Sequence, residues 1–155
     1  MPGKFADGAA WSKLLRVHAV MMHRLEDMLQ VKYRISHGEF EVLLRLSWAA
    51  DQRMRIRELA DASVITRSGM SRLVDRLEAA GLVQCETASE DARGAYAILT
   101  STGRERLNAA EESNIALVRE SFLSLYTEGE LAQIVELWNR FLNHPPSQPQ
   151  PSSLP

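Results

Sequence analysis

Apolar residues recur at helical spacing through the middle of the chain. Four of them fall at i, i+3, i+4 and i+7: Met70, Leu73, Val74 and Leu77. This spacing predicts a helix with one apolar stripe that faces a core. Thr66 is the expected N-cap of this helix, and Gly81 is its expected C-terminal stop. A shorter helix is expected immediately before it, over residues 56–62.

After Gly81 the helical spacing gives way to two short runs suited to strands. These runs cover residues 82–87 and 95–99, and a polar segment that contains a glycine, residues 88–94, lies between them. Two such runs around a polar tip predict a β-hairpin. Helix, turn, helix and hairpin in this order are typical of a winged helix-turn-helix, a fold that reads DNA.

Longer amphipathic stretches flank this central region. The first, within residues 9–30, carries an apolar stripe at Trp11, Leu14, Leu15, His18, Met21, Met22, Leu25, Met28 and Leu29. Two more helices are expected within residues 101–142. A helix of about 20 residues is about 30 Å long, which is more than a small winged core can cover. We therefore expect a second copy of the chain to cover these stripes; the alternative is a monomeric helical bundle.

Two further segments complete the expected organisation. Residues Ser36 to Glu39 form a capping-box pattern, and a strongly apolar helix follows over residues 40–48. This helix would link the long helices to the winged core. Residues 143–155 contain five prolines and almost no apolar side chains, so this tail is expected to be disordered.

The polar face of the central helix carries the candidate chemistry. It combines small hydroxyl groups with guanidinium groups at Arg67, Ser68, Ser71, Arg72 and Arg76. Arginine can bond guanine bidentately, and short hydroxyl side chains bond bases or phosphates without holding the helix away from them. The pattern therefore favours a DNA-contacting face. The alternative is an ordinary solvated surface helix.

The net charge of −2 argues at first against a nucleic-acid partner. The distribution of charge answers this objection. Residues 53–76 hold six arginines and three acidic residues, whereas residues 107–155 hold two arginines and six glutamates. Positive charge is thus concentrated in the segment expected to meet DNA.

Three segments, Ser71–Val83, Glu90–Arg93 and Leu99–Arg104, resemble the MarR (multiple antibiotic resistance regulator) family, and the resemblance extends over roughly residues 10–142. It implies a mainly α fold with a small β-hairpin wing (α+β) and long N- and C-terminal dimerisation helices. Residues 1–142 would form one domain, with a winged region at 53–100 and dimerisation helices at 9–30 and 101–142. It also implies a homodimer that binds double-stranded DNA at a near-palindromic operator, with repression the commoner mode among relatives.

The resemblance assigns a role to the tip of the hairpin. In this family an Asp-x-Arg element places its arginine in the minor groove while the aspartate orients it, and Asp91 and Arg93 occupy those positions. A narrow minor groove concentrates negative potential, so an arginine there adds affinity with little base readout. The tip has Gly94 after Arg93, where many relatives have a second basic residue, so we expect a weaker contact than is usual in the family.

Many relatives are released from DNA by small aromatic or phenolic compounds that bind where the long helices meet the winged domain. The residues that would form such a crevice here mix aromatic, apolar and polar groups: Trp11, His18, Met22, Arg34, His37 and Trp48. Each of them has an ordinary alternative role in the core, an interface or the surface.

Other chemistries find no support in the sequence. His18 and His23 are five residues apart, which splays them on a helix, so no metal site is expected, nor any cofactor. No nucleophile elbow or phosphate-binding glycine loop is present, so an enzyme is not expected. The remaining alternative is a winged protein-interaction module without specific DNA binding.

The cysteine and hydropathy patterns indicate the compartment. The single Cys85 excludes an intramolecular disulfide and fits a reducing cytoplasm. Peroxide-sensing relatives carry their reactive cysteine in the first long helix, which has none here, so we expect Cys85 to be buried and inert. We expect neither a membrane span nor a signal peptide.

Overall fold

The computed structural model describes residues 4–63, 65–87 and 94–143. Its elements, in chain order, are α1 (Lys4–Tyr33), α2 (His37–Trp48), η1 (Ala50–Gln52), β1 (Arg53–Arg55), α3 (Ile56–Asp61), α4 (Arg67–Ala79), β2 (Val83–Thr87), β3 (Ala95–Leu99), α5 (Ser101–Ser121), η2 (Leu123–Leu125) and α6 (Glu128–Asn143). The chain forms two compact units, residues 1–116 and residues 117–155. The expected helices and hairpin are all present, and the expected tail (143–155) lies outside the described residues except for Asn143.

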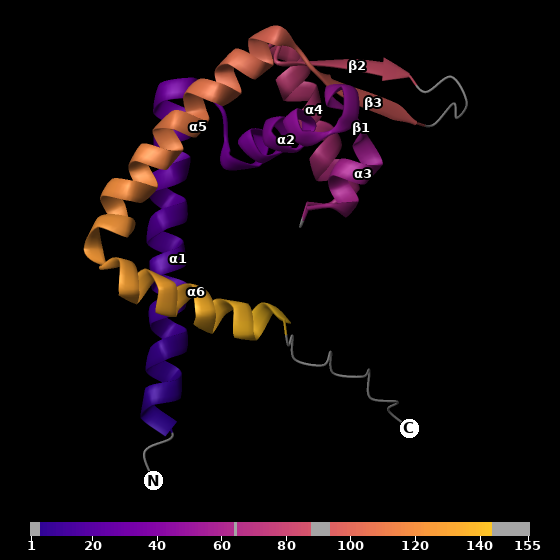
Figure 1. The fold of residues 1–155 in the computed structure, drawn as a ribbon. Helices are drawn as coiled ribbons and strands as arrows, with labels where there is room; N and C mark the ends of the chain where they lie inside the picture. Colours follow the sequence, from indigo (N-terminus) through magenta and orange to yellow (C-terminus); the bar gives the residue numbers. More distant parts are fainter. Residues whose placement is uncertain (1–3, 64, 88–93, 144–155) are drawn as a thin grey trace, which may run out of the picture. The chain divides into compact units, whose positions relative to one another are not determined.

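In the first unit, α2, α3 and α4 gather beside an antiparallel sheet (Figure 1). The strand order is β1-β3-β2. In the hairpin, Val83 pairs with Leu99 and Thr87 with Ala95, so the two strands are in register along their whole length. The third strand, β1, pairs with β3 and was not predicted from the sequence. Its three residues alternate polar and apolar side chains, but a run this short does not stand out as a strand.

An apolar core holds this unit together. Its most deeply buried side chains are Leu29, Val42, Leu43, Leu46, Leu59, Met70, Val74, Leu77, Leu82 and Leu107. They come from α1 to α5 and from the connection into β2, and Val83 of β2 and Ala97 and Leu99 of β3 belong to the same core. Burial of each such side chain contributes roughly 1.5–3 kcal/mol, and these contacts dominate the stability of the unit.

Helix α4 has the boundaries and the buried face that its sequence predicts. The side-chain oxygen of Thr66 accepts a hydrogen bond from the N–H of Gly69 at 3.2 Å. At the other end Gly81 adopts a φ of 71°, a left-handed conformation that favours glycine and ends the helix. The stripe of Met70, Leu73, Val74 and Leu77 is buried. The polar face of α4 is therefore fixed outward by burial of the opposite face.

The turn between α1 and α2 confirms the predicted capping box. The N–H of Glu39 bonds to Ser36 Oγ at 3.2 Å, and the N–H of Ser36 bonds to Glu39 Oε2 at 2.8 Å. Tyr33, the last residue of α1, also contacts α5, because its hydroxyl donates to the carbonyl oxygen of Ala109 at 2.7 Å. The N-terminal end of α2 is thus held in place by side chains as well as by its core face.

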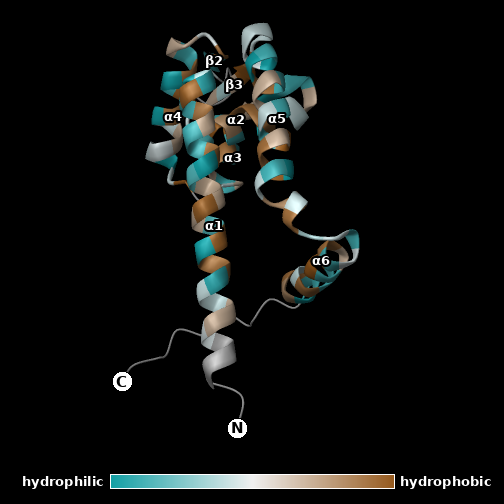
Figure 2. Ribbon diagram, turned by 90° about the vertical axis from the view of Figure 1, so that its left-hand side faces the viewer, coloured by the Kyte–Doolittle hydropathy of each residue, from teal (hydrophilic) through white to brown (hydrophobic). Residues whose placement is uncertain are grey.

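The long helices leave apolar side chains exposed, as their stripes predict. Residues 8–20 of α1 are all exposed, and Trp11 is 62% exposed. Hydrophobic residues recur along α1 in Figure 2. In the second unit α6 begins with a capping box, since the N–H of Thr127 bonds to Glu130 Oε2 at 2.8 Å and the N–H of Glu130 bonds to Thr127 Oγ1 at 3.3 Å. Hydrogen bonds from the backbone and the hydroxyl of Thr127 lower the pKa of Glu130. The large apolar residues of α6, including Trp138 and Phe141, are exposed.

Candidate nucleic-acid interface

The outer face of α4 presents the polar side chains predicted to meet DNA. Ser68, Ser71 and Arg72 are all exposed. The hydroxyl of Ser71 donates to the carbonyl oxygen of Arg67 at 3.1 Å, which leaves its oxygen available to accept another bond. Arg67 lies 3.6 Å from Asp61 of α3, in an exposed ion pair. Because exposed pairs contribute only ~0–1 kcal/mol, a phosphate can draw Arg67 from Asp61 at little cost.

A cavity beside this face is lined with arginines. It has a volume of about 370 Å³ and lies among α3, α4 and the start of β3, lined by Arg55, Ile56, Arg57, Arg67, Ser71, Gly94 and Ala95. Three guanidinium groups and no carboxylate line it, and guanidinium groups are suited to binding anions such as phosphate. Arg67 and Ser71 on α4 thereby join one basic surface with the helix that precedes it.

Strand β1 adds arginines that are tied to the wing. The guanidinium of Arg53 lies 3.9 Å from the centre of the Tyr96 ring and 3.3 Å from a carboxylate oxygen of Glu86. Arg55 donates from Nε to the hydroxyl of Tyr96 at 2.9 Å. The sequence predicts these arginines as part of the local positive charge, and they are not among the residues predicted to contact DNA. The alternation of arginine at residues 53, 55 and 57 was the signal that could have identified them.

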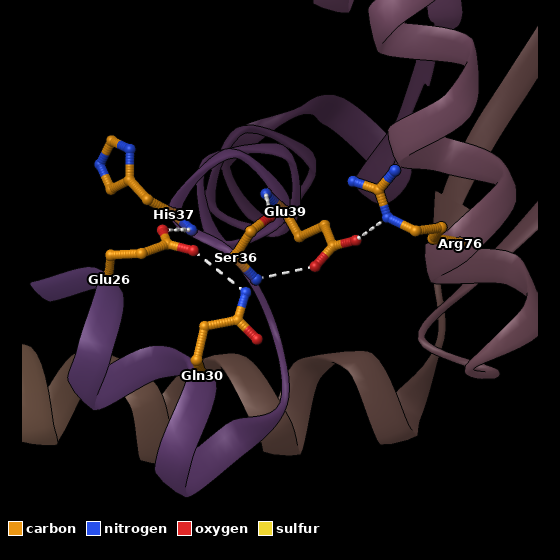
Figure 3. A network of polar contacts seen from close by, with 6 residues as sticks. All are labelled: Glu26, Gln30, Ser36, His37, Glu39 and Arg76. Carbon is orange, nitrogen blue, oxygen red and sulfur yellow. Dashed lines mark hydrogen bonds and ion pairs between the residues drawn. The ribbon is translucent and has the colours of Figure 1, made fainter.

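Arg76, the remaining predicted residue of α4, lies next to α2. Its Nε donates to Oε1 of Glu39 at 2.7 Å, and Figure 3 shows this pair together with the turn that precedes α2. The side chain of Arg76 stays 57% exposed, whereas that of Glu39 is only 9% exposed. The predicted wing residues Asp91 and Arg93 lie outside the described residues.

The six residues considered for a small effector are spread over the first unit. Trp11 and Trp48 are 62% and 74% exposed. A second cavity of about 400 Å³ is lined by Arg34, Ile35, Glu39, Arg76, Leu77, Ala79, Ala80 and Leu82. Arg34 is the one effector candidate that lines either of these two cavities. His37 lies 3.9 Å from Glu41, and His18 and Met22 belong to α1.

Cys85 is half-buried on β2. Burial, followed by the nearby carboxylate of Glu78, raises the pKa of the Cys85 thiol to about 11. A thiol that stays protonated at neutral pH is a poor nucleophile, which agrees with the expected inert role. In the described part of the chain, no three histidine, cysteine, aspartate or glutamate side chains lie close enough to hold a metal ion. No helix among the described residues is both long and apolar enough to cross a membrane.

The arrangement of α3, α4 and the three-stranded sheet defines a winged helix-turn-helix protein. Residues 35–94 match the profile of the MarR family. The crystal structure of AbsC, a MarR family transcriptional regulator from Streptomyces coelicolor, shares 30% identity and superimposes with a TM-score of 0.79 over 91% of this chain and 95% of that one. The chain therefore belongs to the MarR family of transcriptional regulators, which confirms the resemblance and the expected fold class and sets aside the enzyme alternative.

Two further relatives extend the comparison. The crystal structure of Sco3205, a MarR family regulator from Streptomyces coelicolor in complex with DNA, shares 28% identity with a TM-score of 0.81, over 97% of this chain and 92% of that one. The transcriptional repressor YetL of Bacillus subtilis is 33% identical over 91 residues, which cover 57% of this chain. This match spans about half of YetL, 54% of its length.

Proposed function

We propose that this chain is a homodimeric transcriptional repressor that binds a near-palindromic operator with the outer face of α4 in the major groove. The observation that carries the proposal is the exposed row of Ser68, Ser71 and Arg72 beside a cavity lined by three arginines. The first set can hydrogen-bond to base edges, and the arginines can neutralise phosphates. Sco3205, which is similar along almost the whole chain, is in complex with DNA.

Each candidate residue has a distinct task in this proposal. Ser68, Ser71 and Arg72 read bases in the major groove, while Arg67 and the exposed part of Arg76 reach phosphates or flanking bases. The wing places Arg93 in the minor groove, where Asp91 orients it. Contacts to phosphate position the protein and supply salt-dependent affinity, whereas contacts to base edges supply specificity.

The exposed apolar residues of the long helices support a dimer. Large side chains such as Trp11 on α1 and Trp138 on α6 are exposed in the single chain. A second copy that covers them would gain roughly 1.5–3 kcal/mol for each side chain that becomes fully buried. A two-fold dimer would place its two α4 helices about 34 Å apart, one turn of DNA.

We also propose that a small aromatic or phenolic compound releases the dimer from DNA. A compound that prefers a dimer with wrongly spaced reading helices lowers operator affinity by the difference in its affinities for the two states. The candidate contacts remain Trp11, His18, Met22, Arg34, His37 and Trp48. The test is a screen of such compounds for loss of DNA binding by the parent protein.

Binding of the purified protein to its own upstream DNA tests the central proposal. The fragment is titrated with salt and competed with random DNA, and Arg72→Ala is compared with Arg140→Ala. Arg140 is an exposed arginine of a different helix, α6, that lies 3.6 Å from Glu136, so its removal costs the same charge without changing α4. We expect binding that resists competition by random DNA. The logarithm of the association constant should fall by about 0.9 per phosphate contact for each tenfold rise in salt concentration. Arg72→Ala should lose this binding and Arg140→Ala should keep it.

Equal affinity for the upstream fragment and for random DNA would leave two explanations: the operator lies elsewhere, or the winged region binds a protein partner. Selection from a random-sequence pool separates them. A selected consensus supports a DNA-binding regulator, and failure to select any consensus would overturn the proposal in favour of a protein-interaction module.

A further inference from the structure

A buried carboxylate lies between α2 and the reading helix α4. Glu39 is 7% exposed, and it is the one charged residue that is buried within the described ranges. Its Oε2 accepts from the N–H of Ser36 at 2.8 Å, and its Oε1 accepts from Nε of Arg76 at 2.7 Å. Figure 3 shows the two bonds diverging from the same carboxylate. Both oxygens are therefore held by directional contacts to different elements.

The bond to Ser36 leads toward α1. Ser36 is the N-cap of α2, and the N–H of the next residue, His37, bonds to Glu26 Oε2 on α1 at 2.7 Å. The other oxygen of Glu26 accepts from Gln30 Nε2 at 3.0 Å, which fixes that carboxylate on the surface of α1. The first turn of α2 is thus tied to α1 through Glu26 and to α4 through Glu39.

The bond to Arg76 fixes the reading helix. Arg76 lies one turn after Arg72, so a rotation of α4 that breaks the contact with Glu39 also moves Arg72. The two helices approach closely here, because a Cβ on Gly38 would lie 3.4 Å from Leu73 Cδ1. Apolar packing between α2 and α4 is non-directional, whereas a charge-assisted hydrogen bond specifies direction as well as distance.

We propose that Glu39 is a positioning residue that sets the rotation of α4 relative to α1 through Arg76. This inference rests on the proposed function, since it concerns how the same helix meets DNA. The change in DNA affinity that it predicts is opposite in sign to a simple charge effect. Removing a carboxylate from a DNA-binding surface strengthens binding on charge alone. Removing a positioning carboxylate weakens binding to the specific sequence.

The test compares two substitutions on α2 in the full chain. Glu39→Gln removes the ion pair but keeps an oxygen that can accept from Ser36. Glu41→Gln is the matched control, because Glu41 is a partly exposed carboxylate of the same helix that lies 3.9 Å from His37. The probes are a duplex that the parent protein selects from a random pool and an unselected duplex of equal length.

We expect E39Q to lose about tenfold affinity for the selected duplex, which corresponds to ~1.4 kcal/mol. Its affinity for the unselected duplex should be unchanged or higher. The E41Q control should bind both duplexes within about twofold of the parent. A second probe is the selected duplex with one base pair inserted between its half-sites. The insertion should lower the affinity of the parent protein more than it lowers the affinity of E39Q.

Arg76→Lys provides an independent variant on the exposed side of the pair. Lysine keeps the charge but has no Nε at the position that bonds Glu39. We expect the same selective loss, and the double variant E39Q/R76K should bind no more weakly than the weaker single variant, because both remove one shared interaction. If E39Q does not fold, R76K alone tests the proposal.

Two results would overturn the inference. One is parent-like binding of the selected duplex by R76K or by a folded E39Q. The other is an equal loss on selected and unselected DNA, which would indicate a smaller folded fraction rather than a misplaced helix. If the parent protein selects no sequence, the proposed function fails and this inference fails with it.

Discussion

The first turn of α5 packs so closely against the base of the wing that one methyl group should disrupt it. A Cβ added to Gly103 would lie 2.0 Å from the carbonyl oxygen of Leu82 and 2.8 Å from Leu99 Cδ1. Ordinary contacts begin near 3.4 Å, so α5 would have to move by more than about 1 Å. The same carbonyl oxygen accepts from the N–H of Thr100 at 3.2 Å, and this bond would be strained too.

These distances set the size of the expected effect of Gly103→Ala. Overpacking costs about 1–3 kcal/mol, and the weakened hydrogen bond costs about 1 kcal/mol. The higher helix propensity of alanine offsets this destabilisation by up to about 1 kcal/mol. The free energy of unfolding should therefore fall by about 2 kcal/mol. With a urea m-value of roughly 2 kcal/mol/M, the unfolding midpoint moves down by about 1 M.

Urea unfolding followed by circular dichroism measures this shift at one fixed protein concentration, because association changes apparent stability. Gly129→Ala is the matched control: this glycine also lies in the first turn of a helix, α6, and a Cβ there meets nothing within 4 Å. The control should be neutral or stabilising by up to about 1 kcal/mol. If Gly103→Ala unfolded at the parent midpoint, the close approach of α5 to Leu82 would be refuted.

Three further predictions concern the site and the local chemistry. Arg72→Ala should lose about 1–3 kcal/mol of binding to the operator with little change on random DNA, whereas Arg93→Ala should weaken both more evenly; equal losses on both DNAs by both variants, measured by titration, would contradict this division. A pKa of about 11 instead of 9.0 leaves roughly a hundredfold less Cys85 thiolate at neutral pH. Maleimide should therefore label the folded protein much more slowly than the urea-unfolded protein, and similar rates would refute the inert assignment. The lowered pKa of Glu130 means that its cap stabilises α6 above the ordinary glutamate pKa and is lost as pH falls through the lowered value. Thr127→Ala should make helicity, followed by circular dichroism, decline at a higher pH than in the parent, and coincident acid titrations would argue against the cap.

The elements that could be predicted from the sequence are those specified by neighbouring residues. The apolar stripe of α4 repeats at helical spacing within one segment. The boundaries of the helix follow from two short-range signals, the N-cap at Thr66 and the left-handed Gly81. The hairpin was predicted in the same way, from two runs and the polar segment between them. Each of these signals lies within a few residues of the structure that it determines.

The features that could not be predicted depend on residues far apart in the chain. Glu39 was identified as part of a capping box, and that local pattern accounts for one of its two oxygens. The partner of the other oxygen, Arg76, lies 37 residues later, and no spacing rule connects them. Strand β1 likewise depends on its pairing with β3, since the alternation in its own sequence, arginine–methionine–arginine, is too short to predict a strand.

The two candidate sites rest on different kinds of sequence evidence. The DNA-contacting face was predicted from one helix, and burial of the opposite face of α4 forces those side chains outward together. The effector residues were drawn from several elements by resemblance to a family, without a local pattern that would bring them together. Neither of the two described cavities gathers them, and Arg34 is the one member that lines either cavity.

Charge shows why local arrangement decides the function of this chain. A net charge of −2 would suggest weak attraction to DNA. At physiological salt, however, charges more than about 8 Å apart are largely screened, so a phosphate responds mainly to its immediate neighbours. The cavity beside α4 is lined by Arg55, Arg57 and Arg67, and these three positive charges outnumber the nearby carboxylate of Asp61, which lies 3.6 Å from Arg67. An acidic protein can therefore bind DNA with a steep salt dependence, and the slope of that dependence counts the phosphates that the arginines neutralise.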